Sequence, residues 1–282
     1  MSKYKVNILH VVASMNRGGA ETFVMNVFRA IDRNKFQFYF LCFSNKHFDY
    51  EDEIKQLGGE IIRIPDVKEV GIVSHIKAIK SVIKDNNINI VHAHTYYNSV
   101  FSLIAAKKAG VSTRIAHSHN TMSEVNPSLV KKIYFALSKL AIRHYATKRI
   151  ACAKEAGYAL FGRGNNFIVI NNGIDLSRFS YKPAIRKDTR IELNIPQDAT
   201  VLLNIARFQE VKNHTYLINV FKEYIKIHPN SHLLLVGDGP LRNTIENKVR
   251  KLKLANCISF TGVRSDTEKM YNSADIFVMP SI

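Results

Sequence analysis

Short apolar runs alternate along the chain with longer segments in which apolar residues recur every three or four positions. The runs predict β-strands, and the periodic segments predict amphipathic helices. Strands alternating with helices indicate a mostly parallel sheet that is covered on both faces. In the first half we expect strands at 6–12, 37–42, 60–64, 90–94, 113–117, 149–152 and 167–170, and helices at 20–31, 52–57, 73–85, 99–109, 128–146 and 154–161.

The alternation pauses after Gly173, where a charged segment with two prolines predicts a linker and a short helix. It then restarts, with strands expected at 200–206, 232–237, 257–261 and 275–279 and helices at 213–228, 240–252 and 265–273. We therefore predict an α/β fold of two Rossmann-like, doubly wound parallel-sheet domains that face a cleft. The expected divisions are an N-terminal domain at 1–178, a linker at 179–199 and a C-terminal domain at 200–282.

The last expected strand has no crossover helix after it, although a parallel sheet needs both faces covered. We therefore expect the second domain to be incomplete here and residues to follow Ile282.

Composition indicates the class of protein and the cellular compartment in which it works. Apolar residues make up 46% of the 282, which is enough for packed cores, and no uncharged apolar stretch is long enough to span a bilayer. The first ten residues lack the pattern of a signal peptide, and three widely spaced cysteines fit a reducing compartment. We expect a cytoplasmic protein.

Charge points to an acidic partner. Forty Lys and Arg oppose 23 Asp and Glu, a formal net charge of +17. No nucleic-acid motif or aromatic–basic ribbon accompanies this charge, so phosphate ligands and an anionic membrane surface are favoured over nucleic acid. A lysine-rich proteome would produce the same excess.

One expected helix, at 128–146, has the composition of a membrane-surface segment. Cations alternate in it with apolar residues, and no acidic residue occurs between 127 and 150. The candidate membrane contacts are Lys131, Lys132, Lys139 and Arg143. An ordinary helix covering a sheet, with a basic outer face, would show the same pattern.

In the first domain, two places combine strand ends with ligand-binding residue types. Gly18 and Gly19 lie between the first strand and its helix, where backbone can approach an anion closely. The spacing is not that of a dinucleotide fingerprint, and a tight turn without a ligand would also need these glycines.

Two histidine pairs, His92 with His94 and His117 with His119, follow at the ends of neighbouring strands. Positions two apart share a face, so zinc could bind there, although Glu124 is the only carboxylate nearby. Histidines that donate to a polar ligand, or that are structural, are the alternatives.

The second domain places an arginine, Arg207, at the end of its first strand and a lysine, Lys212, at the start of the next helix. Two cations beside a helix N-terminus can bind a diphosphate. Two solvated surface cations without a ligand would give the same sequence pattern. The following strands end at Gly237-Asp238 and at Gly262-Val263, two further turns that allow close approach.

The order of these motifs resembles the retaining glycosyltransferases of family four, which have the GT-B fold, and in particular their capsule and exopolysaccharide members. The resemblance covers nearly the whole chain and is carried by residues 18–21, 91–94, 119, 171–175, 179, 207, 212, 236–240, 260–262, 271–275 and 280–281. The family's next motif, a glutamate pair, would follow Ile282.

The resemblance implies roles for these residues. His119 would contact the donor sugar, and Arg207 with Lys212 would bind the donor diphosphate and stabilise its developing charge. The glycine loop at Gly18-Gly19 and the turns at Gly237-Asp238 and Gly262-Val263 would border the donor.

The implied reaction moves a hexose from a nucleotide-diphosphate sugar, with UDP as the expected nucleotide, to a growing and lipid-linked glycan. The anomeric configuration would be retained, no metal or other cofactor would be needed, and the enzyme would work at the inner face of the plasma membrane. A sugar-nucleotide epimerase of the same fold, a non-catalytic nucleotide-sugar-binding fragment and a histidine–zinc hydrolase are the alternatives.

Overall fold

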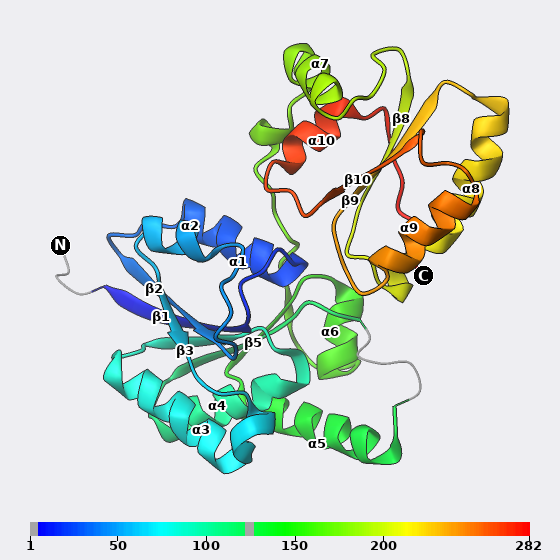
Figure 1. The fold of residues 1–282 in the computed structure, drawn as a ribbon. Helices are drawn as coiled ribbons and strands as arrows, with labels where there is room; N and C mark the ends of the chain where they lie inside the picture. Colours follow the sequence, from blue (N-terminus) through cyan, green and yellow to red (C-terminus); the bar gives the residue numbers. More distant parts are fainter. Residues whose placement is uncertain (1–4, 122–126) are drawn as a thin grey trace. The chain divides into compact units, whose positions relative to one another are not determined.

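The computed structural model describes residues 5–121 and 127–282, and the chain forms two compact units, Met1–Ile174 and Asp175–Ile282 (Figure 1). Each unit holds one parallel sheet with helices on both faces, so the predicted α/β class with two Rossmann-like domains is confirmed. Among the described helices, none has the length and apolar character needed to cross a bilayer.

The N-terminal unit is built on a seven-stranded sheet of order β3-β2-β1-β4-β5-β6-β7. Its strands are β1 Val6–Ala13, β2 Phe36–Cys42, β3 Glu60–Arg63, β4 Ile90–Ala93, β5 Thr113–Ser118, β6 Lys148–Ala151 and β7 Ile168–Val169. Its helices are α1 Gly19–Ala30, α2 Glu51–Gln56, α3 Val67–Asp85, α4 Ser99–Lys108, α5 Leu129–Tyr145 and α6 Lys154–Phe161, with a short 3-10 turn, η1, at Tyr96–Asn98.

Alternation along β1 divides the core of this unit into two layers. Leu9 and Val11 pack with residues of α3 to α6 on one face, whereas Ile8 and Val12 pack with α1 and α2 on the other (Figure 1). His10 therefore lies on the same face as Ile8 and Val12, beneath α1.

Helix α3 begins earlier than the expected residue 73. Asp66 caps its N-terminus by accepting a hydrogen bond from the backbone N–H of Lys68, and the helical periodicity is then interrupted at Gly71, whose φ is 76°. The glycine permits this positive φ, so α3 consists of two helical pieces, one before and one after Gly71. The periodicity of apolar residues predicted only the piece after it.

The C-terminal unit has a four-stranded sheet of order β10-β9-β8-β11. Its strands are β8 Thr200–Ile205, β9 Ser231–Val236, β10 Ile258–Gly262 and β11 Ile276–Phe277. Its helices are α7 Pro183–Glu192, α8 His214–Ile227, α9 Arg242–Lys251 and α10 Thr267–Ser273, with 3-10 turns η2 at Leu176–Phe179 and η3 at Glu210–Lys212.

The segment expected as a linker at 179–199 contains α7, which belongs to the C-terminal unit. Arg190 on this helix is fully buried and donates to the carbonyl oxygens of Ser273 and Ala199, each at 2.9 Å. It also pairs with Asp275 at 2.9 Å. These bonds to α10 and to the residues just before β8 and β11 give α7 a fixed place, which the charge of its sequence did not indicate.

Candidate active site

Both cations predicted to bind a diphosphate lie on the loop between β8 and α8. Arg207 is exposed just after the strand, and Lys212 is half-buried at the end of η3, next to the N-terminus of α8. Among the described residues, neither side chain forms an ion pair. Asn213, the N-cap of α8, makes no side-chain capping bond, so the first N–H groups of the helix are available to an anion.

Lys212 also acts on a neighbouring histidine. Burial and then the positive charge of Lys212 lower the pKa of His214 to about 4, so this imidazole is neutral at pH 7. Arg207, Lys212 and the helix N-terminus are therefore the positive groups of this loop.

The glycines after β9 are required by backbone packing against the β8–α8 loop. A Cβ on Gly237 would lie 2.2 Å from the carbonyl oxygen of Ala206, and one on Gly239 would lie 2.5 Å from that of Phe208. The two loops are joined by a hydrogen bond from the Phe208 N–H to the Asp238 carbonyl oxygen, 2.9 Å long. This packing holds the loop that carries Arg207.

The third predicted turn, at Gly262-Val263 after β10, lies at the same end of the sheet. Gly262, with φ of 72°, accepts a hydrogen bond from the Gly237 N–H at 2.8 Å, and Val263 after it is 53% exposed. Asp238 is exposed and uses its carboxylate to accept from the Gly239 N–H. The predicted donor-binding residues of the C-terminal unit are thus brought together at the carboxyl ends of β8, β9 and β10, where parallel sheets bind ligands.

In the N-terminal unit, Gly18 is the N-cap of α1 and Gly19 is its first residue. A Cβ on Gly19 would meet no atom within 4 Å, so the described residues supply no packing reason for this glycine. The helix N-terminus places a positive dipole end at the carboxyl edge of the sheet, and the carboxylate of Glu21 in its first turn lies 2.3 Å from where a Cβ on Gly18 would stand. An anionic ligand beside this loop stays a prediction.

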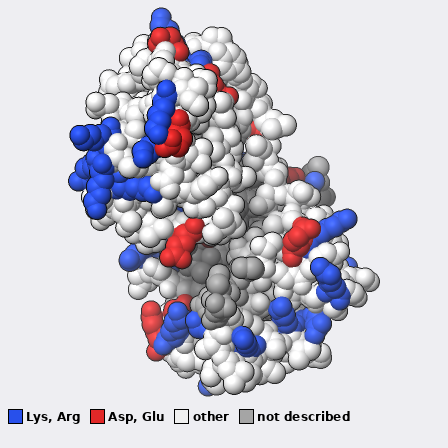
Figure 2. Space-filling model, turned by 90° about the vertical axis from the view of Figure 1, so that its right-hand side faces the viewer, with Lys and Arg blue, Asp and Glu red and all other residues white. Residues whose placement is uncertain are grey.

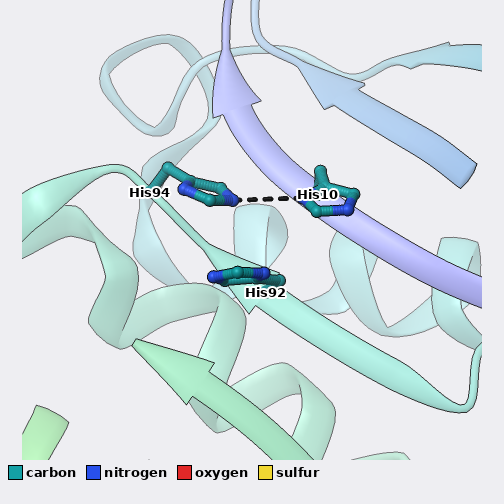
Figure 3. A group of neighbouring side chains, drawn as sticks. All are labelled: His10, His92 and His94. Atoms are coloured by element: carbon teal, nitrogen blue, oxygen red, sulfur yellow. Dashed lines mark hydrogen bonds between the residues drawn. The ribbon is translucent and has the colours of Figure 1, made fainter. Parts of the chain in front are cut away.

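Five imidazoles form a connected cluster beneath α1. His10 on β1 lies beside His94 after β4, with Nδ1 and Nε2 3.1 Å apart, and Figure 3 shows these two rings above His92. Nδ1 of His94 lies 2.9 Å from Nε2 of His119, and Nε2 of His92 lies 3.1 Å from Nδ1 of His117. The last four could be paired from the sequence, but His10 could not, because its only signal was a histidine at a core position of a buried strand.

These histidines are neutral at pH 7 because burial disfavours their charged form. Burial, and then repulsion from His117, lowers the pKa of His10 to about 3, and burial lowers that of His119 to about 4. The pKa of His117 falls to about 2, and those of His92 and His94 lie well below 6.5, with burial as the largest cause in each case. The cluster therefore holds hydrogen bonds between neutral rings.

Neutral imidazoles can also bind a metal, and two sets of three, His10-His92-His94 and His94-His117-His119, have nitrogens within 4.8 Å of one another. A ligating histidine normally donates its far N–H to a carboxylate or a carbonyl. Within the described residues the far nitrogens of His10, His117 and His119 have no such partner. Glu124, the carboxylate considered earlier, lies outside the described residues. The rings are within hydrogen-bond distance of one another, and the absence of a metal from this cluster stays a prediction.

The predicted membrane helix, α5, has two apolar faces. Tyr134, Phe135 and Ile142 pack into the unit. A second set is more than half exposed: Leu129, Val130, Ile133, Leu137 and Leu140. At 100° per residue this exposed set spans a single stripe, and Lys132, Lys139 and Arg143 lie along one side of it. An ordinary covering helix needs only the inner face.

Elsewhere the positive charge is dispersed. On the face drawn in Figure 2, basic side chains form several separate groups with acidic side chains between them. A continuous basic band of the kind that tracks a nucleic-acid backbone is not present on that face.

Comparison with solved structures identifies the fold. An Anabaena protein, HepE, in complex with UDP and glucose matches 98% of this chain and 74% of its own with a TM-score of 0.79 at 18% identity. WaaG, a glycosyltransferase involved in lipopolysaccharide biosynthesis, matches 97% of this chain with a TM-score of 0.64 at 15% identity. The predicted GT-B fold is confirmed.

Comparison of sequences identifies the family. Residues 17–178, more than half of the chain, match the family described as Glycosyltransferase Family 4, and residues 185–282 match Glycosyl transferases group 1. A Bacillus subtilis protein named as the glycosyltransferase EpsF is 34% identical over 100% of this chain and 75% of its own length. The chain belongs to the family-four glycosyltransferases, and the predicted resemblance is confirmed.

A second relative is named for its reaction. The Escherichia coli UDP-Gal:alpha-D-GlcNAc-diphosphoundecaprenol alpha-1,3-galactosyltransferase is 27% identical over 99% of this chain and 74% of its own length. Together with a Staphylococcus aureus capsular polysaccharide biosynthesis glycosyltransferase, CapH, at 25% identity, these relatives assign the protein to polysaccharide or glycolipid biosynthesis.

Proposed function

We propose that this glycosyltransferase moves a hexose from a UDP-sugar to a growing, lipid-linked glycan of the cell surface, with retention of anomeric configuration. The observation that carries the proposal is the loop between β8 and α8, where Arg207 and Lys212 flank an uncapped helix N-terminus. That loop can take the charge of a diphosphate leaving group, and the two cations would replace a metal ion in this role. The names of HepE's complex and of the E. coli relative support a UDP donor and a lipid-linked acceptor.

Transfer of label tests the function directly. The protein is incubated with radiolabelled UDP-glucose, UDP-galactose or UDP-N-acetylglucosamine and a bacterial lipid extract, with and without EDTA. We expect one donor to pass label to the lipid phase in both conditions, and an α-anomeric signal for the product in its NMR spectrum. Interconversion of the UDP-sugars without transfer would instead identify an epimerase, and binding without turnover would identify a non-catalytic fragment.

We further propose that α5 places the enzyme on the inner face of the plasma membrane. Its exposed apolar stripe can enter the headgroup region, while Lys131, Lys132, Lys139 and Arg143 contact anionic lipid, each cation contributing about 1 kcal/mol. The net charge of +17 adds long-range attraction to the same surface.

Liposome co-sedimentation tests this placement. We expect binding to vesicles that contain phosphatidylglycerol, little binding to phosphatidylcholine, and weaker binding in high salt. Replacing Lys131, Lys132, Lys139 and Arg143 by glutamine should abolish binding without unfolding the protein.

The matched control removes four cations from the C-terminal unit, Lys222, Lys248, Arg250 and Lys251. This variant has the same net charge but should still bind. Equal loss of binding in both variants would mean that net charge, and not α5, directs the protein to the vesicles.

A further inference from the structure

Three of the clustered imidazoles form a chain that leads from the core of the N-terminal unit to the predicted donor-sugar contact. His10 contacts His94 at 3.1 Å, and the other nitrogen of His94 contacts His119 at 2.9 Å. Figure 3 shows the first of these two links, between rings carried by β1 and by the segment after β4. His94 thus uses both of its ring nitrogens within the chain.

The protons in such a chain are not independent. Each neutral imidazole carries one N–H and one lone pair, and each link needs an N–H on one side and a lone pair on the other. If His10 carries its proton on Nδ1, then His94 and His119 must also carry theirs on Nδ1. If His10 carries its proton on Nε2, the other two must do the same. Any mixed arrangement sets two N–H groups or two lone pairs against each other at about hydrogen-bond distance.

Burial at the inner end selects between the two arrangements. Nε2 of His10 is buried with no partner among the described residues, and the ring of His10 lies 4.4 Å from that of Phe38 and 6.0 Å from that of Phe40. A proton there would be a donor without an acceptor in an apolar core, and orphaned buried N–H groups are rarer in proteins than orphaned acceptors. Nδ1 of His119, at the outer end, is also buried without a partner among the described residues, but its ring as a whole is half-buried, whereas the ring of His10 is buried in the core.

We propose that His10 and His94 are positioning residues that hold His119 in the tautomer protonated at Nδ1. Nδ1 of His119 is buried and has no partner within the described part of the chain, so in this tautomer its N–H is a donor that a ligand oxygen would satisfy. A sugar hydroxyl accepts such a bond. The sugar contact rests on the proposed function, whereas the tautomer is a property of the protein without substrate.

NMR of protein labelled with ¹⁵N-histidine measures the tautomers directly. Long-range ¹H–¹⁵N correlation spectra distinguish Nδ1–H from Nε2–H rings, and the spectra of His119→Gln and His94→Gln assign two of the three. We expect His10, His94 and His119 all to be protonated at Nδ1 at pH 7.5. A mixed set of tautomers, or Nε2–H at His119, would overturn the proposal.

A variant tests the coupling along the chain. His10→Phe removes the donor to His94 while keeping a ring between Phe38 and Phe40, and we expect His119 to become a mixture of tautomers. His92→Phe, which alters the separate His92–His117 pair, should leave His119 unchanged. An unchanged His119 in His10→Phe would overturn the coupling. Should His10→Phe fail to fold, His94→Gln takes its place.

Activity and metal addition complete the test. Loss of one well-oriented hydrogen bond should lower kcat of His10→Phe about tenfold, with KM for the donor within about twofold. Failure of the transfer assay with the expected tautomers in place would count against the proposed function alone. Stoichiometric Zn²⁺ uptake that shifts all five histidine signals would replace the hydrogen-bonded chain by a metal site.

Discussion

Alanine at Arg207 or at Lys212 is expected to lower kcat/KM for sugar transfer by about one to two orders of magnitude. Each substitution removes a charge-assisted contact to the diphosphate, worth about 1.5–3 kcal/mol. The loss should be larger for kcat than for donor affinity, because negative charge grows on the leaving diphosphate in the transition state. Steady-state kinetics with the donor identified by the labelling assay measures both parameters.

Two further variants sharpen this experiment. Arg207→Lys keeps the charge but loses the planar fork of donors, so its activity should lie between those of wild type and Arg207→Ala. Lys222→Ala removes a cation from α8, away from its N-terminus, and should leave the kinetics unchanged. Wild-type rates in both alanine variants would remove the diphosphate site from this loop.

Much of the fold could be predicted because each buried strand is a short apolar run, whereas each covering helix has apolar residues at every third or fourth position. β1, expected at 6–12, occupies Val6–Ala13, and α8, expected at 213–228, occupies His214–Ile227. The start of α3 could not be predicted in this way, because Gly71 breaks the period between its two pieces. A short helix was expected after Gly173, but the packing of α7 in the C-terminal unit could not be predicted, since the burial of Arg190 depends on partners more than eighty residues away along the chain.

The candidate site was predictable to the extent that it lies at strand ends. Arg207, Gly237 and Gly262 could be located from the ends of three neighbouring strands, and the parallel register of β8, β9 and β10 brings them to one edge. The sequence did not reveal why the β9 turn needs its glycines, which is the approach of the Ala206 and Phe208 carbonyl oxygens. His10 was missed because its partner, His94, is 84 residues away.

The same histidine cluster should make the N-terminal unit unfold in mild acid. The five histidines of the cluster have folded-state pKa values well below 6.5, so they stabilise the fold relative to the unfolded chain only above that pH. As the pH falls below 6.5, the unfolded chain binds protons that the folded unit does not. Each such histidine then costs about 1.4 kcal/mol per pH unit, down to its folded pKa.

Such groups can offset much of the stability of a typical domain. His10, His117 and His119, whose folded pKa values lie below 5, each contribute about 2 kcal/mol of destabilisation at pH 5, and their sum is comparable to a total stability of about 5–15 kcal/mol. The C-terminal unit holds two histidines with lowered pKa, His214 and His232, so its stability should fall less steeply. Carboxylates such as Glu51, whose pKa is about 2, begin to lose their contribution only at lower pH.

Urea titrations between pH 8 and pH 4.5, followed by circular dichroism, should therefore show two transitions that separate as the pH falls. Pulsed proteolysis with mass spectrometry should assign the earlier one to residues 1–174. His10→Phe removes one titrating group and should reduce the proton uptake on unfolding by about one. Equal acid sensitivity of the two units would show that the histidines of the cluster are accessible to protons in the folded state, and that the hydrogen-bonded chain of neutral imidazoles does not persist in solution.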